Sequence, residues 1–133
     1  MQTFLPYPDL RDSVACLDSK RLGKQRVECL QILNVLEGRR TGWQNHPAVK
    51  MWAGRTGALH LYKDLCINEW VRRGYNNTML RTATIDLEQR MPDWWGGEIH
   101  ATHRSNLLRK DAQHYGQFDW AESNDLPYFW PVK

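Results

Sequence analysis

The sequence predicts an all-α fold: a compact single-domain helical bundle with an extended N-terminal arm and an irregular, aromatic-rich C-terminal tail. Three observations favour it. Apolar residues recur at helical spacing in several segments, and no segment sustains the alternation that is typical of a strand. The chain has 133 residues, which suits one domain with one hydrophobic core. We therefore expect residues 1–133 to form a single domain.

The N-terminal arm and the first helix are predicted from local signals. Two prolines within residues 1–12 favour extended backbone there. The first helix is predicted from about Asp12 or Ser13, either of which can cap it, to Leu36. Gly38 then acts as the stop signal.

The remaining elements follow from apolar spacing and from glycine and proline positions. Pro47 fits the first turn of a short helix through Trp52. A longer helix is predicted over Ala58–Arg73 and ends at Gly74. After it we expect, in order, a weak helix, a turn region, a last clear helix and an irregular tail: Asn77–Arg90, Met91–Gly97, His103–Tyr115 and Gly116–Lys133.

The composition is that of an ordinary globular protein. Apolar residues make up 41% and charged residues 25%, and the apolar runs are too short for a membrane span or a secretory signal. Three widely spaced cysteines without a C-x-x-C pair indicate unpaired core thiols in a reducing cytoplasm. A net charge of +3 permits a polyanionic partner. We expect a cytoplasmic protein without a membrane or an obligate protein partner.

The first predicted helix carries a narrow polar stripe. At 100° per residue, Lys20, Lys24, Glu28 and Gln31 project within about 80° of one another, with Arg21 beside them. Apolar residues occupy most of the remaining circumference, so we expect a central helix whose stripe faces something specific. The alternative is a surface ion pair between Lys24 and Glu28.

Two other residues of this helix need an explanation. Gly23 costs roughly 1 kcal/mol relative to Ala, which suggests the close approach of another backbone or a ligand. Arg26 points into the apolar arc, either as a structural clamp held by a carboxylate or carbonyls or as a ligand for a bound molecule.

Two polar clusters are candidate phosphate contacts. His46 stands at a predicted helix N-terminus, which favours anions; alternatively it and Asn45 only satisfy the loop backbone. The segment from His100 to Asp111 concentrates cationic and small polar residues, for which ordinary surface charge is the alternative. His100 and His103 have H-x-x-H spacing but no third ligand nearby, so we expect no metal and no cofactor.

Several motifs, taken together and in order, resemble the pyrimidine dimer DNA glycosylase family: Met1–Pro6, Leu17–Glu28, Asn45-His46-Pro47 with Trp52, Trp70–Tyr75 and His103–Asp111. The resemblance implies a compact all-helical enzyme whose N-terminal segment threads near the first helix. Family enzymes cut the glycosidic bond of a damaged nucleotide with the α-amino group of the chain. They form a Schiff base with the sugar and then eliminate the 3′ phosphate.

On this resemblance the catalytic residues are Met1 and Glu28. The family's amine belongs to a threonine exposed by removal of Met, whereas here Gln2 follows Met1 and Thr3 comes later, and Met is usually retained before Gln. An α-amine, with a pKa near about 7.8, is partly neutral and nucleophilic at cell pH. The family's glutamate aligns with Gly23, so Glu28 is the nearest candidate for the acid/base.

The resemblance implies DNA as the partner. The expected DNA-binding residues are Lys20, Arg21, Lys24, Trp43, Asn45, His46, His103, Arg104 and Arg109. Most of them are expected to hold phosphates, and Trp43 is the candidate wedge for base extrusion. Two alternatives stay open: a non-catalytic DNA-binding protein of the same fold, and a nucleotide hydrolase or transferase that works without a Schiff base.

Overall fold

The computed structural model describes residues 1–82 and 91–132, and within these ranges it contains helices and no strand. The helices in chain order are α1 (Leu10–Cys16), α2 (Ser19–Leu36), α3 (Pro47–Lys50), α4 (Thr56–Arg72), α5 (Ile99–Lys110) and α6 (Ala112–Tyr115), followed by one 3-10 turn at Gly116–Phe118. The all-α prediction is confirmed. Among the described helices, none has the length and apolarity needed to cross a membrane.

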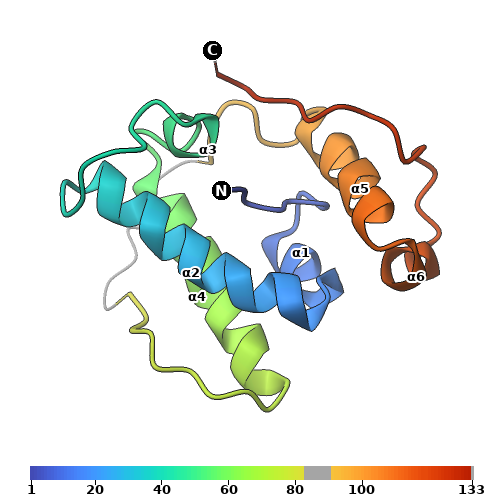
Figure 1. Ribbon diagram of the computed structural model, residues 1–133, viewed down its shortest axis with the longest axis horizontal. Helices are drawn as coiled ribbons and strands as arrows, with labels where there is room; N and C mark the ends of the chain where they lie inside the picture. The colour runs from blue at the N-terminus through green and yellow to red at the C-terminus, as the bar shows by residue number, and fades with distance from the viewer. Residues whose placement is uncertain (83–90, 133) are drawn as a thin grey trace.

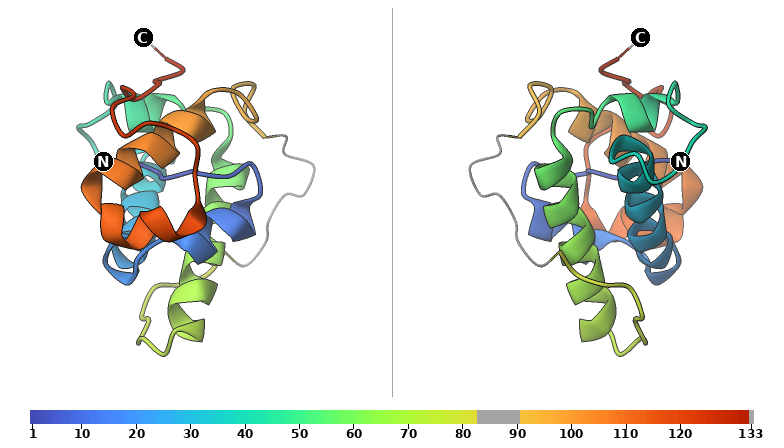
Figure 2. Two further views of the ribbon diagram at one scale, coloured as in Figure 1. Left: turned by 90° about the vertical axis from the view of Figure 1, so that its right-hand side faces the viewer. Right: turned by 90° about the vertical axis from the view of Figure 1, so that its left-hand side faces the viewer.

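Helices α2 and α4 pack against each other, and α1 also packs on α4 (Figure 1). Helix α5 lies on the other side of the N-terminal arm, so the arm runs between α5 and the α2–α4 pair (Figures 1 and 2). Leu22, Leu33 and Leu59 are fully buried in the core between α2 and α4, together with the free thiols of Cys29 and Cys66. The predicted unpaired core cysteines are confirmed.

The first predicted helix is two helices, so its predicted start is wrong. Helix α1 is capped by Asp9, whose carboxylate accepts from the N–H of Asp12. The chain then turns at Leu17 and Asp18, where Asp18 has extended backbone and accepts from the N–H of Arg21 at 3.3 Å. Asp favours this N-cap role over a place inside a helix, because its side chain satisfies an otherwise free N–H.

The ends of α2 and α4 agree with the sequence. Helix α2 ends at Leu36, and Gly38 follows with φ of +79°. Helix α4 ends at Arg72, and Gly74 has φ of +93°, a conformation that glycine adopts without strain. Helix α3 is shorter than predicted and stops at Lys50.

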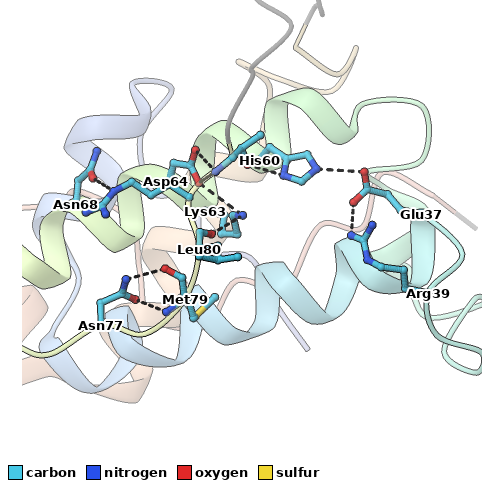
Figure 3. Close-up of polar contacts among 11 residues, drawn as sticks. Glu37, Arg39, His60, Lys63, Asp64, Asn68, Asn77, Met79 and Leu80 are labelled. Carbon is cyan, nitrogen blue, oxygen red and sulfur yellow. Dashed lines mark hydrogen bonds and ion pairs between the residues drawn. The ribbon is translucent and has the colours of Figure 1, made fainter.

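Residues 77–82 are irregular, although a weak helix was predicted to begin there. The Asn77 side chain accepts from the N–H of Met79 and donates to its carbonyl, and Lys63 Nζ donates to the carbonyl of Leu80 at 3.3 Å (Figure 3). These side-chain bonds hold the backbone in a non-helical path along α4. The rest of the predicted helix lies outside the described residues.

The last predicted helix also differs at both ends. Helix α5 begins at Ile99, a turn earlier than predicted, and ends at Lys110. Asp111 interrupts it with φ of −153° and ψ of 77°, and its carboxylate caps α6 by accepting from the N–H of His114. The turn region before α5 and the largely irregular tail are as predicted.

The arm is held by side chains instead of a neighbouring strand. The N–H of Leu5 donates to His103 Nδ1 at 2.9 Å, and His100 Nδ1 lies 2.7 Å from the Leu5 carbonyl. His100 Nε2 accepts from the N–H of Gly96, so His100 is neutral and donates through Nδ1. His103 must likewise be neutral at Nδ1 to accept. Burial, with a smaller effect of the neighbouring His100, lowers the pKa of His103 to about 3.

Stability is therefore expected to fall as the pH drops below 6.5. The unfolded chain protonates His103 near its ordinary pKa of 6.5, whereas the folded protein does not until about 3. The contribution of neutral His103 to the free energy of unfolding is fully present above pH 6.5. Below pH 6.5 the free energy of unfolding falls by about 1.4 kcal/mol per pH unit, or about 2 kcal/mol by pH 5. Denaturant unfolding between pH 7.5 and 5 measures the loss.

The His103→Asn variant keeps an uncharged acceptor for Leu5 and cannot be protonated. We expect it to be less stable at neutral pH but to have a flatter pH dependence. The matched substitution His114→Asn, outside the contacts of the arm, should leave the slope in place. An unfolding free energy for the unmodified chain that is constant from pH 7.5 to 5 would contradict a neutral, buried His103.

Candidate active site

A cleft of about 410 Å³ opens where the arm passes α2 and the C-terminal tail. Four cationic side chains and three aromatic rings line it together with the chain terminus: Met1, Gln2, Phe4, Lys20, Arg21, Lys24, Gln25, Glu28, Lys110, Tyr128 and Trp130. The polar stripe predicted on the first helix thus faces a cleft. The cations give this cleft the charge that attracts phosphate.

Glu28 is the carboxylate of the cleft, and the arm fixes its position. Glu28 Oε2 accepts from the N–H of Gln2 at 3.1 Å and from Gln25 Nε2 at 3.3 Å. Among the described residues Glu28 forms no ion pair, so the predicted alternative of a surface pair with Lys24 is wrong. A carboxylate held by neutral donors beside the lysines of the cleft suits proton transfer next to bound phosphate.

His46 lies within electrostatic range of both the Met1 α-amino group and the Glu28 carboxylate. Burial lowers the pKa of His46, the Met1 ammonium lowers it further, and the Glu28 carboxylate opposes the change. His46 Nδ1 accepts from the N–H of Ala48 at 3.0 Å, so the imidazole caps α3 itself. His46 therefore uses one of the N–H groups at the start of α3 that were predicted to bind an anion. This bond agrees with the alternative prediction, in which His46 satisfies the loop backbone.

Trp43 lines a smaller, adjoining pocket. This pocket, of about 100 Å³, is formed by Met1, Gln31, Val35, Arg40 and Trp43. The Trp43 side chain is 57% exposed, its ring lies 5.9 Å from that of His46, and its φ is +65°. Such exposure leaves one ring face for contact with another molecule. Asn45 is exposed in the same loop but lines neither pocket.

Three other predicted site residues do not line the cleft. His103 is 1% exposed and bonds the arm. Arg104 donates to the Pro6 carbonyl at 2.7 Å and to Glu122 at 2.6 Å, so its guanidinium is used inside the protein. Arg109 is exposed and donates to Asn106 and to a tail carbonyl. Arg104 therefore bonds the arm and the tail, and Arg109 bonds the tail.

The face of α2 that carries Gly23 looks away from the cleft. A Cβ at Gly23 would lie 2.8 Å from Cζ3 of Trp70, so the close neighbour is an aromatic side chain of α4. Arg26 lies on the same side, with its guanidinium 4.5 Å from the Trp70 ring centroid and bonded to Asn77 Oδ1 at 2.6 Å. Arg26 is thus a clamp held by a ring and an amide, not by a carboxylate.

Sequence reasoning missed Gln2, Phe4, Gln25, Lys110, Tyr128 and Trp130 as lining residues. A signal existed for Gln25, a polar residue one turn before Glu28 and flanked at helical spacing by the apolar Leu22 and Cys29. No sequence signal pointed to Tyr128 and Trp130, because their positions depend on how the irregular tail folds back.

The described residues thus form a helical protein whose first residues lie beside a carboxylate in a cationic cleft, which suits a polyanionic partner. The family model of pyrimidine dimer DNA glycosylases matches residues 1–83, which is more than half of the chain. The chain belongs to the pyrimidine dimer DNA glycosylase family. Neither the curated proteins nor the solved structures gave a match.

Gly23→Ala is expected to destabilise the protein although Ala favours helices. The new Cβ would approach the Trp70 ring within 3 Å, and overpacking of this kind costs about 1–3 kcal/mol. Thermal or denaturant unfolding measures the change. In a Trp70→Ala background the ring is gone, and the same substitution should become stabilising by up to about 1 kcal/mol through helix propensity. Equal effects in both backgrounds would rule out the steric explanation.

Proposed function

We propose that this chain is a DNA glycosylase for damaged or modified pyrimidines, with an abasic-site lyase activity. The α-amino group of Met1 is the nucleophile and Glu28 is the acid/base. The observation that carries the proposal is the bond from the N–H of Gln2 to Glu28 at 3.1 Å, which places a carboxylate next to the first residue inside a cationic cleft.

The proposed chemistry balances with the groups present. The neutral amine attacks C1′ of the sugar, the C1′–N bond breaks, and the proton that the amine loses passes to the departing base. The C1′–O4′ bond then opens, O4′ takes a proton from water, and an iminium forms between the amine and C1′. Glu28 takes the C2′ proton, and the electron pair expels the 3′ phosphate. The ionised carboxylate also stabilises the positive sugar in both steps.

The cleft supports DNA binding through its cations. Lys20, Arg21, Lys24 and Lys110 line the same cleft as Glu28 and are proposed to hold the phosphates that flank the target nucleotide, Arg21 while paired with Asp18 at 3.1 Å. Trp43, one pocket further along, is proposed as the wedge that fills the space of an extruded nucleotide. Asn45 and His46, in the same loop as Trp43, are proposed to contact the DNA beside it.

A covalent adduct is expected when the protein meets abasic-site DNA in the presence of borohydride, because the reductant fixes the iminium. Glu28→Gln should lower the single-turnover elimination rate by about 100-fold or more, since proton transfer by a positioned side chain contributes this much. Glu98→Gln removes a carboxylate at an exposed site outside the cleft and should leave the rate unchanged. Gel analysis and intact mass measure both.

The same adduct tests the nucleophile. Peptide mapping should place the reduced sugar on the α-amine of Met1, and acetylation of this amine should abolish trapping. An adduct on a lysine, or full trapping by a protein with a blocked or extended N-terminus, would refute the Met1 assignment. Tight, salt-dependent binding without an adduct would instead favour the non-catalytic DNA-binding protein.

Lys24→Ala is expected to weaken DNA binding and to flatten its salt dependence. One lost phosphate contact lowers the slope of log Kd against log salt by about 0.9. Arg109→Ala is the matched control, because Arg109 bonds Asn106 and lies outside the cleft. Fluorescence anisotropy with a short duplex over a salt series measures both variants. Identical slopes for Lys24→Ala and the unmodified chain would place the DNA elsewhere.

A further inference from the structure

Gln25 is a buried amide between the arm and the carboxylate of the cleft. It lies on α2 one turn before Glu28, and its side chain is almost completely enclosed, with 1% of the residue exposed. A buried amide without partners is costly, so its bonds reveal what the position is for.

The oxygen and the nitrogen of the Gln25 amide each have two polar neighbours. Its Oε1 accepts from the N–H of Phe4 at 2.7 Å and lies 3.0 Å from the Tyr62 hydroxyl, whose one O–H it shares with the Phe4 carbonyl. Its Nε2 donates to the carbonyl of Gln2 at 2.7 Å and to Glu28 Oε2 at 3.3 Å. A primary amide has two acceptor sites and two N–H groups, so the orientation of Gln25 is fixed by partners on both sides.

This arrangement determines which oxygen of Glu28 is free. Gln25 and the N–H of Gln2 both donate to Oε2. Within the described part of the chain Oε1 has no such donor, which leaves it for a group bound in the cleft. The same amide holds the backbone on both sides of Thr3 and so limits where Met1 can lie.

We propose that Gln25 is a positioning residue that holds the Met1 amine and Glu28 in one geometry by bonding the arm and the carboxylate at once. The inference rests on the proposed function. It follows that loss of the amide slows the reaction through Glu28, because a displacement of about 1 Å costs up to about 100-fold in rate.

The test compares Gln25→Met with Ser13→Ala. Gln25→Met keeps the volume and removes the amide. Ser13→Ala removes two bonds from the far end of the arm, to the N–H and the carbonyl of Tyr7, and leaves Glu28 untouched. Single-turnover elimination, affinity for uncleavable abasic-site DNA and hydrogen exchange at residues 2–4 are measured for each. If Gln25→Met does not fold, Gln25→Glu takes its place, since it keeps the acceptor for Phe4 and lacks the amide donor.

We expect Gln25→Met to lower the elimination rate by about 10- to 100-fold with unchanged DNA affinity, and Ser13→Ala to act at nearly the rate of the unmodified chain. In a Glu28→Gln background the further effect of Gln25→Met should disappear, because both changes remove the same proton-transfer geometry. A purely structural role predicts equal losses for Gln25→Met and Ser13→Ala, or additive losses with Glu28→Gln, and either result overturns the proposal.

Failure of the proposed function is distinguishable. If the unmodified chain neither excises nor forms an adduct, the reaction is refuted and the positioning role falls with it. Hydrogen exchange then still reports whether Gln25 holds the arm, since only Gln25→Met should expose the amides of residues 2–4. Normal catalysis by the unmodified chain and by Gln25→Met would refute the positioning role alone.

Discussion

The fold depends on satisfying the backbone of a buried extended arm that pairs with no strand among the described residues. Each buried N–H or carbonyl left without a partner costs about 1–3 kcal/mol, so the partners must come from side chains. Gln25 of α2, Tyr62 of α4, and His100 and His103 of α5 supply them. Because the donors and acceptors stand on three helices, the arm joins these helices and brings the first residue to the edge of α2.

The two faces of helix α2 have different neighbours. Gly23 and Arg26 face α4, where Trp70 fills the space that a side chain at position 23 would need. Gln25 and Glu28 face the arm and the cleft. Five residues along a helix correspond to a rotation of about 140°, so no carboxylate at position 23 could share a site with Glu28. Close packing of a ring against glycine therefore leaves the other face for the carboxylate that we propose as the acid/base.

Local signals predicted the elements well and the polar interior poorly. Helical spacing and terminal glycines located α2 and α4, and the stripe of Lys20, Lys24 and Glu28 does face a cleft. Polar residues such as His103 and Arg104, however, look the same in sequence whether they bind phosphate or a buried carbonyl. Their partners are residues of the arm about one hundred positions away, and no local pattern encodes such a contact.

Relative to the family pattern, the proposed amine and the proposed carboxylate are both shifted toward the C-terminal end of α2. The amine lies two residues before Thr3, and two extended residues span about 7 Å. Glu28 lies five residues beyond Gly23, and five helical residues rise about 7.5 Å. The arm runs toward the C-terminal end of α2, since Phe4 bonds Gln25 whereas Gln2 also bonds Glu28. The proposed amine and the proposed carboxylate are therefore shifted by similar distances along the axis of α2, and Glu28 in addition lies on the face of the helix that meets the arm.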